Sequence, residues 1–284
     1  MPDRLQRERL TRQLQTGVVL LAMALLFAAT GFVLLGTAGL AILIGTGLVM
    51  LVFVSRQEVK VDTSAAQPVS REAHPALHEA LDELSEKAGI PEKPEPYIVP
   101  ADEMNAATMG KESKPIMAVT SPMLRALSDR ELRAIIAHEI VHLSQHDLSF
   151  FKLVMMLQIL TMSVARIGWL LLILMWPLAL AGGARIPPLA VLLLLGAPVI
   201  SVLLQAALSR AREYAADLGA VELTGDPEGL ASALEKIDRR REQLWRQVLP
   251  MPQQRRRGGS ILRTHPAQEE RVRKLREIKP TVES

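Results

Sequence analysis

The chain has 284 residues, of which 49% are hydrophobic and only 4% aromatic, so its apolar content is mainly aliphatic. The formal net charge of +3 is a mild excess that an orientation signal beside a membrane can account for, and the basic residues show no aromatic interleaving, which argues against a nucleic-acid partner. Cysteine is absent, which excludes disulfides and thiolate metal sites, so any metal ligands must be histidines or carboxylates.

The first long apolar stretch, Gly17–Val54, contains no charged residue. It is nearly twice as long as the roughly 20 residues that cross the hydrocarbon core as one helix. Gly36 and Gly39 lie near its midpoint, where permissive residues favour a tight turn. We therefore predict a transmembrane hairpin over 17–54 after a cytoplasmic segment, residues 1–16. A cleaved signal peptide is the alternative, but its apolar region would be shorter and end at a small-residue cleavage site.

A second apolar block covers residues 151–208. It is interrupted by Gly182-Gly183-Ala184-Arg185-Ile186-Pro187-Pro188, which predicts a loop between two further spans, Met162–Ala181 and 186–208. Pro198 in the last span would be tolerated as a kink, since neighbouring helices can satisfy the freed backbone groups. The sequence thus predicts four transmembrane helices in two hairpins.

Basic residues are concentrated on one side of the predicted spans. Arginines precede the first hairpin and further basic residues follow it, whereas its connecting turn is uncharged. The loop of the second hairpin has only Arg185, and Arg210 and Arg212 come just after its end. Because positively charged loops favour the cytoplasm, we expect a multi-pass protein of the cell membrane. Both termini and both soluble parts, residues 55–150 and 209–284, would then be cytoplasmic.

Two helices and a small sheet are predicted between the hairpins. Residues 71–90 place leucines at helical spacing and end at Gly89, which predicts an amphipathic helix; these leucines are Leu77, Leu81 and Leu84. Two extended runs, Pro96–Val99 and Ile116–Thr120, predict strands separated by a turn-forming segment around Asn105 and Gly110. A second, longer helix should begin at Ser128, which forms a capping box with Glu131.

The longer helix contains the sequence His138-Glu139-Ile140-Val141-His142. Two histidines four residues apart share one helical face and can direct two imidazole nitrogens at one ion. Glu139 is rotated so that it reaches a water at the metal, and it is predicted to accept that water's proton as a general base. Chance occurrence on a solvated face is the competing interpretation. The apolar residues on both sides favour a buried metal site.

A third ligand has to come from elsewhere in the chain. The extended motif with a third histidine at position 148 is absent, because this position is Leu148. His146 lies too far along a straight helix to converge on the same ion and is interpreted as a surface or outer residue. Glu213 is the better candidate, with Asp217 on the same helical face to orient His138, because ligating imidazoles commonly donate their other N–H to a carboxylate.

Four segments together resemble the HtpX-like membrane zinc peptidases, relatives of the CAAX prenyl endopeptidases within the gluzincin group. The segments are Ala137–His142, Ser209–Asp217, Gly225–Pro227 and Thr264–Val272. The resemblance covers most of the chain. It implies a mainly α membrane protein with four transmembrane helices in two hairpins and a cytoplasmic α+β catalytic domain of the zincin type with a small sheet.

The resemblance also assigns roles to individual residues. It implies that His138, His142 and Glu213 bind one Zn²⁺, that Glu139 is the general base, and that Asp217 supports the ligands. His265 resembles the histidine that stabilises the oxyanion in this family. The alternative is that Thr264-His265-Pro266 merely starts the last helix. Arg271 could pair with an acidic residue of the site.

For substrate binding, the resemblance implies that residues 105–110 and 118–120 flank the cleft, with an edge strand that pairs with the substrate backbone. Asn105, Ala118 and Val119 are the predicted contacts. Ala107 stands where an aromatic residue would be expected, so the shape of the pocket departs from the family pattern. An arginine-rich segment, residues 239–257, is interpreted either as a site for anionic lipid or an acidic partner, or as a solvated loop.

These features predict a zinc endopeptidase that cleaves membrane or misfolded proteins at the cytoplasmic face. The resemblance implies a role in protein quality control and stress response. Its partners would be protein or peptide substrates and the lipid bilayer. A processing peptidase for one lipidated or signal-bearing substrate is a second hypothesis. A catalytically silent zinc-binding scaffold is a third, although such a scaffold would not need Glu139.

Overall fold

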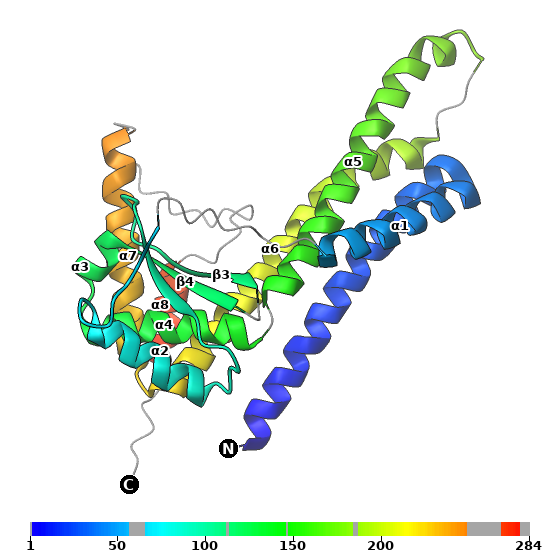
Figure 1. Cartoon of the computed structure of the whole chain (residues 1–284). Coiled ribbons are helices and arrows are strands. Elements are labelled where there is room, and N and C mark those ends of the chain that lie inside the picture. Colours follow the sequence, from blue (N-terminus) through cyan, green and yellow to red (C-terminus); the bar gives the residue numbers. More distant parts are fainter. Residues whose placement is uncertain are drawn as a thin grey trace. The chain divides into compact units, whose positions relative to one another are not determined.

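The computed structural model describes residues 2–56, 66–111, 114–145, 147–183, 187–248 and 268–278 (Figure 1). Most of these residues are helical, and the strands form one small sheet. The chain divides into two compact units. Unit 1 consists of residues 1–57 and 149–211, and unit 2 consists of residues 58–148 and 212–284. The predicted mainly α architecture with a small sheet is therefore confirmed.

Unit 1 is built from long apolar helices. These are α1 (Pro2–Arg56), α5 (Asp147–Leu180) and the first part of α6 (Pro188–Thr224). Gly36 interrupts α1 with a φ of 61° and a ψ of −146°, values that glycine adopts without steric cost, and the ribbon of α1 changes direction along its length (Figure 1). Many aliphatic side chains are exposed, such as Leu170 at 66%. Such surfaces are unfavourable in water and suit a lipid environment.

Two helices in the described part of the chain are long and apolar enough to cross a membrane, Leu153–Leu180 and Pro188–Thr224. The apolar parts of α1, Gly17–Val33 and Gly36–Met50, are shorter. The helix that contains the third predicted span begins at Asp147, and its apolar part runs from Leu153, before the predicted start at Met162. Four crossings and their orientation stay a prediction.

A polar contact joins α5 to α6. Ser201, which is fully buried, donates a hydrogen bond of 2.6 Å from its hydroxyl to the side-chain oxygen of Gln158. Further along α5, Gly168 allows close approach to α6, since a Cβ there would lie 2.3 Å from a methyl group of Leu194. Small residues and hydrogen bonds between helices are the usual means of helix association where lipid surrounds both helices.

Unit 2 contains a four-stranded sheet of β1 (Gln67–Pro68), β2 (Glu95–Val99), β3 (Ala106–Lys111) and β4 (Lys114–Thr120), in the order β1-β2-β4-β3. β4 pairs parallel with β2 and antiparallel with β3. Both predicted strands are present. The turn expected around Asn105 and Gly110 is wrong, because most of that segment is β3. Its sequence has little strand character, and its extended form is stabilised by pairing with β4.

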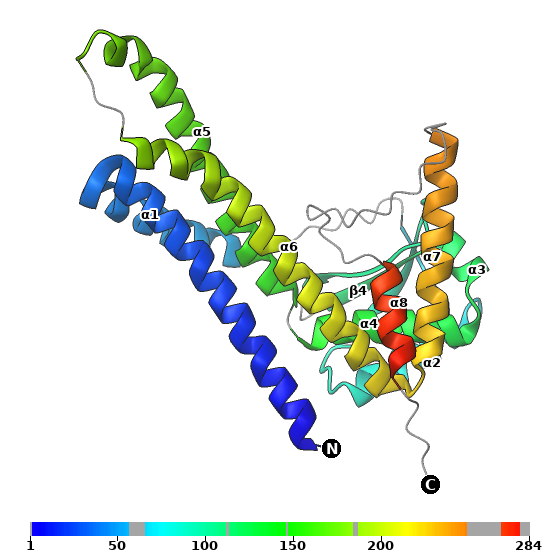
Figure 2. The ribbon, with the colours of Figure 1, turned by 180° about the vertical axis from the view of Figure 1, so that it is seen from behind.

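The described part of unit 2 also contains the end of α6 and five further helices. These are α2 (Pro75–Lys87), α3 (Ser121–Ala126), α4 (Asp129–Ser144), α7 (Pro227–Val248) and α8 (Gln268–Glu277), with α4 in contact with β3 and α8 beside α7 (Figure 2). The leucines predicted to face the core are fully buried in α2, and Gly89 follows that helix with a φ of 66°. They pack in one hydrophobic cluster with Ile136 and Ile140 of α4 and Leu230 of α7. This core fixes the position of α4.

The N-terminus of α4 is held by the predicted capping box. The Ser128 amide donates to the Glu131 carboxylate at 2.8 Å, and the Ser128 hydroxyl accepts the Glu131 amide at 3.4 Å. Glu131 also accepts from Ser232 at 2.6 Å and Lys236 at 2.7 Å, both on α7. Burial raises the pKa of Glu131, but these donors outweigh it and lower the pKa to about 2. A buried, ionised carboxylate thus ties α4 to α7.

Candidate metal centre

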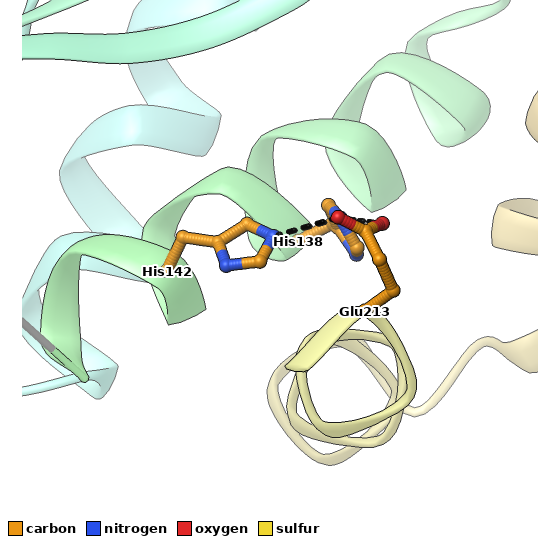
Figure 3. Close-up of side chains that lie close together, drawn as sticks. All are labelled: His138, His142 and Glu213. Atoms are coloured by element: carbon orange, nitrogen blue, oxygen red, sulfur yellow. Dashed lines mark hydrogen bonds and ion pairs between the residues drawn. The ribbon is translucent and has the colours of Figure 1, made fainter. Parts of the chain in front are cut away.

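His138 and His142 lie on one face of α4, as their spacing predicts (Figure 3). Their side chains are 8% and 16% exposed. The two Nε2 atoms are 3.2 Å apart, and the rings meet edge to face. Because the flanking isoleucines and alanines are buried in the core of unit 2, these imidazoles have little access to bulk water.

Glu213 is brought to the histidines by α6 (Figure 3). Its Oε2 lies 3.6 Å from Nε2 of His138, and its Oε1 lies 4.0 Å from Nε2 of His142. One ligand atom from each of the three residues can be chosen so that all lie within 4.8 Å of one another. Two imidazole nitrogens and one carboxylate oxygen therefore converge from two helices.

Close packing between α4 and α6 makes this convergence possible. At Gly219 of α6, a Cβ atom would lie 2.8 Å from both methyl groups of Val141, which is closer than real Cβ atoms approach. Ala216 and Ala220 flank this position and are fully buried. Small residues along this stretch of α6 allow the two helix backbones to come near enough for Glu213 to reach the histidines.

Asp217 and Arg271 form a buried layer behind the three candidate ligands. Asp217 Oδ1 lies 3.0 Å from Nδ1 of His138, and the Arg271 guanidinium donates to both oxygens of Asp217 at 2.6 and 2.7 Å. A third nitrogen of Arg271 lies 2.9 Å from Oε2 of Glu213. Contact with Asp217 favours the His138 tautomer that leaves Nε2 free to bind a metal. Arg271, from α8, is thus the predicted partner of acidic residues in the site.

The electrostatics of the site favour one centre of positive charge. Burial lowers the pKa of His138, but the carboxylates of Asp217 and Glu213 outweigh it and raise that pKa to about 9. Burial and the charge of His138 together lower the pKa of His142 to about 4. A cation between these groups can take the place of the proton on His138, since metal binding by imidazole releases its proton.

The donor set fits a zinc ion. Zn–N bonds of about 2.0–2.1 Å in tetrahedral geometry separate two nitrogens by roughly 3.3–3.4 Å, close to the 3.2 Å between the histidines. Two imidazoles and one carboxylate form the ligand set of several zinc peptidases. The carboxylates of Glu139, Glu213 and Asp217 attract a cation to the site, and the positive charges of Arg271 and Arg212 partly oppose them.

Glu139 follows the first histidine in α4, and its half-buried side chain extends to β3 of the sheet. Its Oε2 accepts a hydrogen bond of 3.2 Å from the backbone N–H of Thr108 in β3. Thr108 lies within the segment 105–110 that is predicted to flank the cleft, but the sequence indicates no role for this residue itself. Nothing in its side chain marks it, because the interacting group is a backbone amide whose direction depends on strand pairing.

The remaining predicted residues have different outcomes. Ala118 and Val119 are buried in β4, which pairs with β2 and β3, so β4 is not the edge that a peptide strand could join. That these two residues flank the substrate cleft stays a prediction. Asn105 is exposed just before β3, and its backbone N–H and C=O are bonded to the side-chain oxygen and the amide of Thr120, both at 3.0 Å. His146, His265 and the second half of the arginine-rich segment lie outside the described residues.

Comparison with known proteins decides the family. The model of Peptidase family M48 matches residues 71–279, which include both histidines, Glu139, Glu213 and Asp217. The chain belongs to peptidase family M48. Members of this family are metal-dependent proteases, so the chain is a metalloprotease, and its apolar helices make it a membrane metalloprotease.

Relatives of this M48 chain come from distant organisms. A "Protease HtpX homolog" of Methylibium petroleiphilum is 33% identical, covering 94% of this chain and 98% of the relative. Homologs of the same name in Nostoc punctiforme and Thermococcus sibiricus are 36% and 35% identical over 80% and 79% of the chain. The crystal structure of S. mikatae Ste24p aligns with a TM-score of 0.48 and 15% identity, covering 95% of this chain and 66% of that one.

Proposed function

We propose that this metalloprotease is a zinc endopeptidase that hydrolyses peptide bonds of membrane or misfolded proteins at the cytoplasmic face of the cell membrane. The observation that carries the proposal is the convergence of His138, His142 and Glu213, with Glu139 beside the first ligand. This is a ligand set with a general base next to it, rather than a closed structural site. The protease activity in this proposal is supported by relatives named Protease HtpX homolog that match most of the chain, and protein quality control is its proposed role.

In this proposal each residue has one task. His138, His142 and Glu213 hold the zinc, which when bound supplies a Lewis acid that polarises the scissile carbonyl and acidifies a water. Glu139 takes the proton from the attacking water and passes it to the leaving amine. Asp217 fixes the His138 tautomer, and Arg271 pairs with Asp217 and Glu213 and holds both carboxylates in place. His265 is proposed to stabilise the oxyanion.

The substrate backbone is proposed to bind along β3. In the described sheet, β3 is paired on one side only, with β4. A peptide in extended conformation can add to such an edge through main-chain hydrogen bonds and is then held beside the metal ligands of α4. Asn105 stands at the start of this edge and is the proposed side-chain contact to the peptide.

Removal of the metal tests the proposal. A chelator should lower cleavage of unfolded casein by the detergent-purified protein by at least about 100-fold, since the zinc provides both the electrophile and the activated water. Stoichiometric Zn²⁺ should restore the rate, whereas Mg²⁺ should not, because Mg²⁺ prefers all-oxygen ligands. Metal analysis should find one zinc per chain. Full cleavage by metal-free protein would contradict the zinc assignment.

We further propose four membrane crossings, with both termini and the catalytic parts in the cytoplasm. Because the chain has no cysteine, single introduced cysteines report accessibility without background. A membrane-impermeant maleimide applied to intact cells should label Thr37→Cys, in the proposed turn of the first hairpin, and should label Ser70→Cys only after lysis. Labelling of Ser70→Cys in intact cells would reverse the proposed orientation.

A further inference from the structure

We propose that the backbone N–H of Thr108 positions the general base, by holding the Glu139 carboxylate at the metal centre. Its nitrogen lies 3.2 Å from Oε2 of Glu139. The two residues belong to different elements, β3 and α4, so the contact fixes the carboxylate relative to the edge on which the peptide is proposed to bind. This inference rests on the function proposed above and adds a positioning group to it.

The register of the sheet explains why this amide is free to act. Hydrogen-bonded and non-hydrogen-bonded pairs alternate along antiparallel strands. Asn105 lies opposite Thr120, whose amide donates to the Asn105 carbonyl at 3.0 Å, so this is a hydrogen-bonded position. Thr108 and Met117, three residues along, are then a non-hydrogen-bonded pair. The N–H of Thr108 therefore points away from β4, toward the open edge.

The amide is also held by a rigid strand. Met117, its pairing partner, is fully buried, and Thr108 Oγ1 lies 3.8 Å from the Met117 sulfur. At the start of β3, Asn105 is bonded to Thr120 through both its amide and its carbonyl. A donor that does not move can orient a carboxylate without reorganisation during the reaction, which is the advantage of preorganised groups.

This arrangement also limits which groups a substrate can use. One N–H serves one acceptor well, so the Thr108 amide is committed to Glu139. The outward N–H and C=O of Ala106 and the C=O of Thr108 remain for the peptide, by the same alternation. The base and the peptide are thus positioned by neighbouring groups of one strand.

Thr108→Pro deletes the amide hydrogen and keeps the strand. Proline is tolerated on an edge strand where the N–H faces away from the ladder. We expect kcat for a fluorogenic peptide to fall about 10- to 100-fold, because a displacement of a catalytic group by about 1 Å can reduce the rate of the reaction by this factor. KM should change by less than about 2-fold and the zinc content should not change. The conservative variant Thr108→Ala keeps the amide hydrogen, so it should keep most of the wild-type kcat.

A double-mutant cycle separates positioning from general damage. In a Glu139→Gln background, Thr108→Pro should lower the residual rate no further, because the group it acts through is already disabled. An equal loss in both backgrounds would overturn the proposal. So would a rise in KM with an unchanged kcat, which would mean that the amide pairs with the substrate instead.

Hydrogen exchange tests the contact without any proline. Glu139→Ala should speed exchange of the Thr108 amide at least 10-fold, while the Met109 amide, which faces β4, should keep its rate. Unchanged exchange at Thr108 would overturn the inference even if the protein is an active zinc protease. Failure of the wild type to cleave with zinc would instead overturn the proposed function, and the exchange result would still stand.

Discussion

Glu139→Gln is expected to lower kcat/KM for an unfolded protein substrate by about 10³-fold while the protein keeps its zinc. General-base catalysis contributes on the order of 10²–10⁴-fold, and the amide of glutamine cannot accept the proton. Glutamine has the same size and still accepts the hydrogen bond from the Thr108 amide, which lies 3.2 Å from the carboxylate. The fold and the ligand arrangement should therefore be preserved. Cleavage kinetics and metal analysis on the same preparation check both parts.

Glu86→Gln is the matched control for this prediction. Glu86 is an exposed glutamate of α2, and its replacement removes the same charge without touching the site. This variant should keep wild-type kinetics. If Glu139→Gln retains zinc and also cleaves at the wild-type rate, then Glu139 is not the base.

Glu213→Ala is expected to abolish both tight zinc binding and activity. It removes the one carboxylate ligand of the proposed set and leaves Arg271, 6% exposed, with Asp217 alone. Loss of a group that only supports a ligand weakens metal binding by about 10–100-fold, so loss of the ligand itself should exceed about 100-fold. Competition with a fluorescent zinc chelator measures the affinity, and added zinc in excess should fail to restore full kinetics.

Two further variants serve as controls for the effect of Glu213→Ala on zinc binding. Glu222→Ala removes an exposed glutamate of the same helix and should bind zinc normally. Asp217→Asn should weaken zinc binding by about 10–100-fold, an intermediate effect, because His138 keeps its place but loses the anionic partner at 3.0 Å. Equal zinc affinity of Glu213→Ala and wild type would remove Glu213 from the ligand set.

Much of the candidate site could be predicted from the sequence, because it depends on residues that are close together along one helix. The spacing of His138 and His142 on one helix determines their shared face, and Ser128 with Glu131 determines where that helix begins. Both are consequences of 3.6 residues per turn. Glu213 and Asp217 could be proposed from resemblance and from their own spacing, but not their distance from the histidines.

Only the tertiary structure decided which groups meet between elements. Strand order could not be derived from two short extended runs, so the sequence does not reveal that β4 is paired on both sides and that β3 is an open edge of the described sheet. For the same reason, neither β3 nor the role of the Thr108 amide could be predicted from the sequence. The direction of a backbone N–H follows from strand register and not from residue type. The His138-Glu-Ile-Val-His142 segment by itself determined a metal-binding face. Packing of α6 against α4 at Gly219 decided that Glu213 reaches it, because helix separation is set by side-chain volume at the contact.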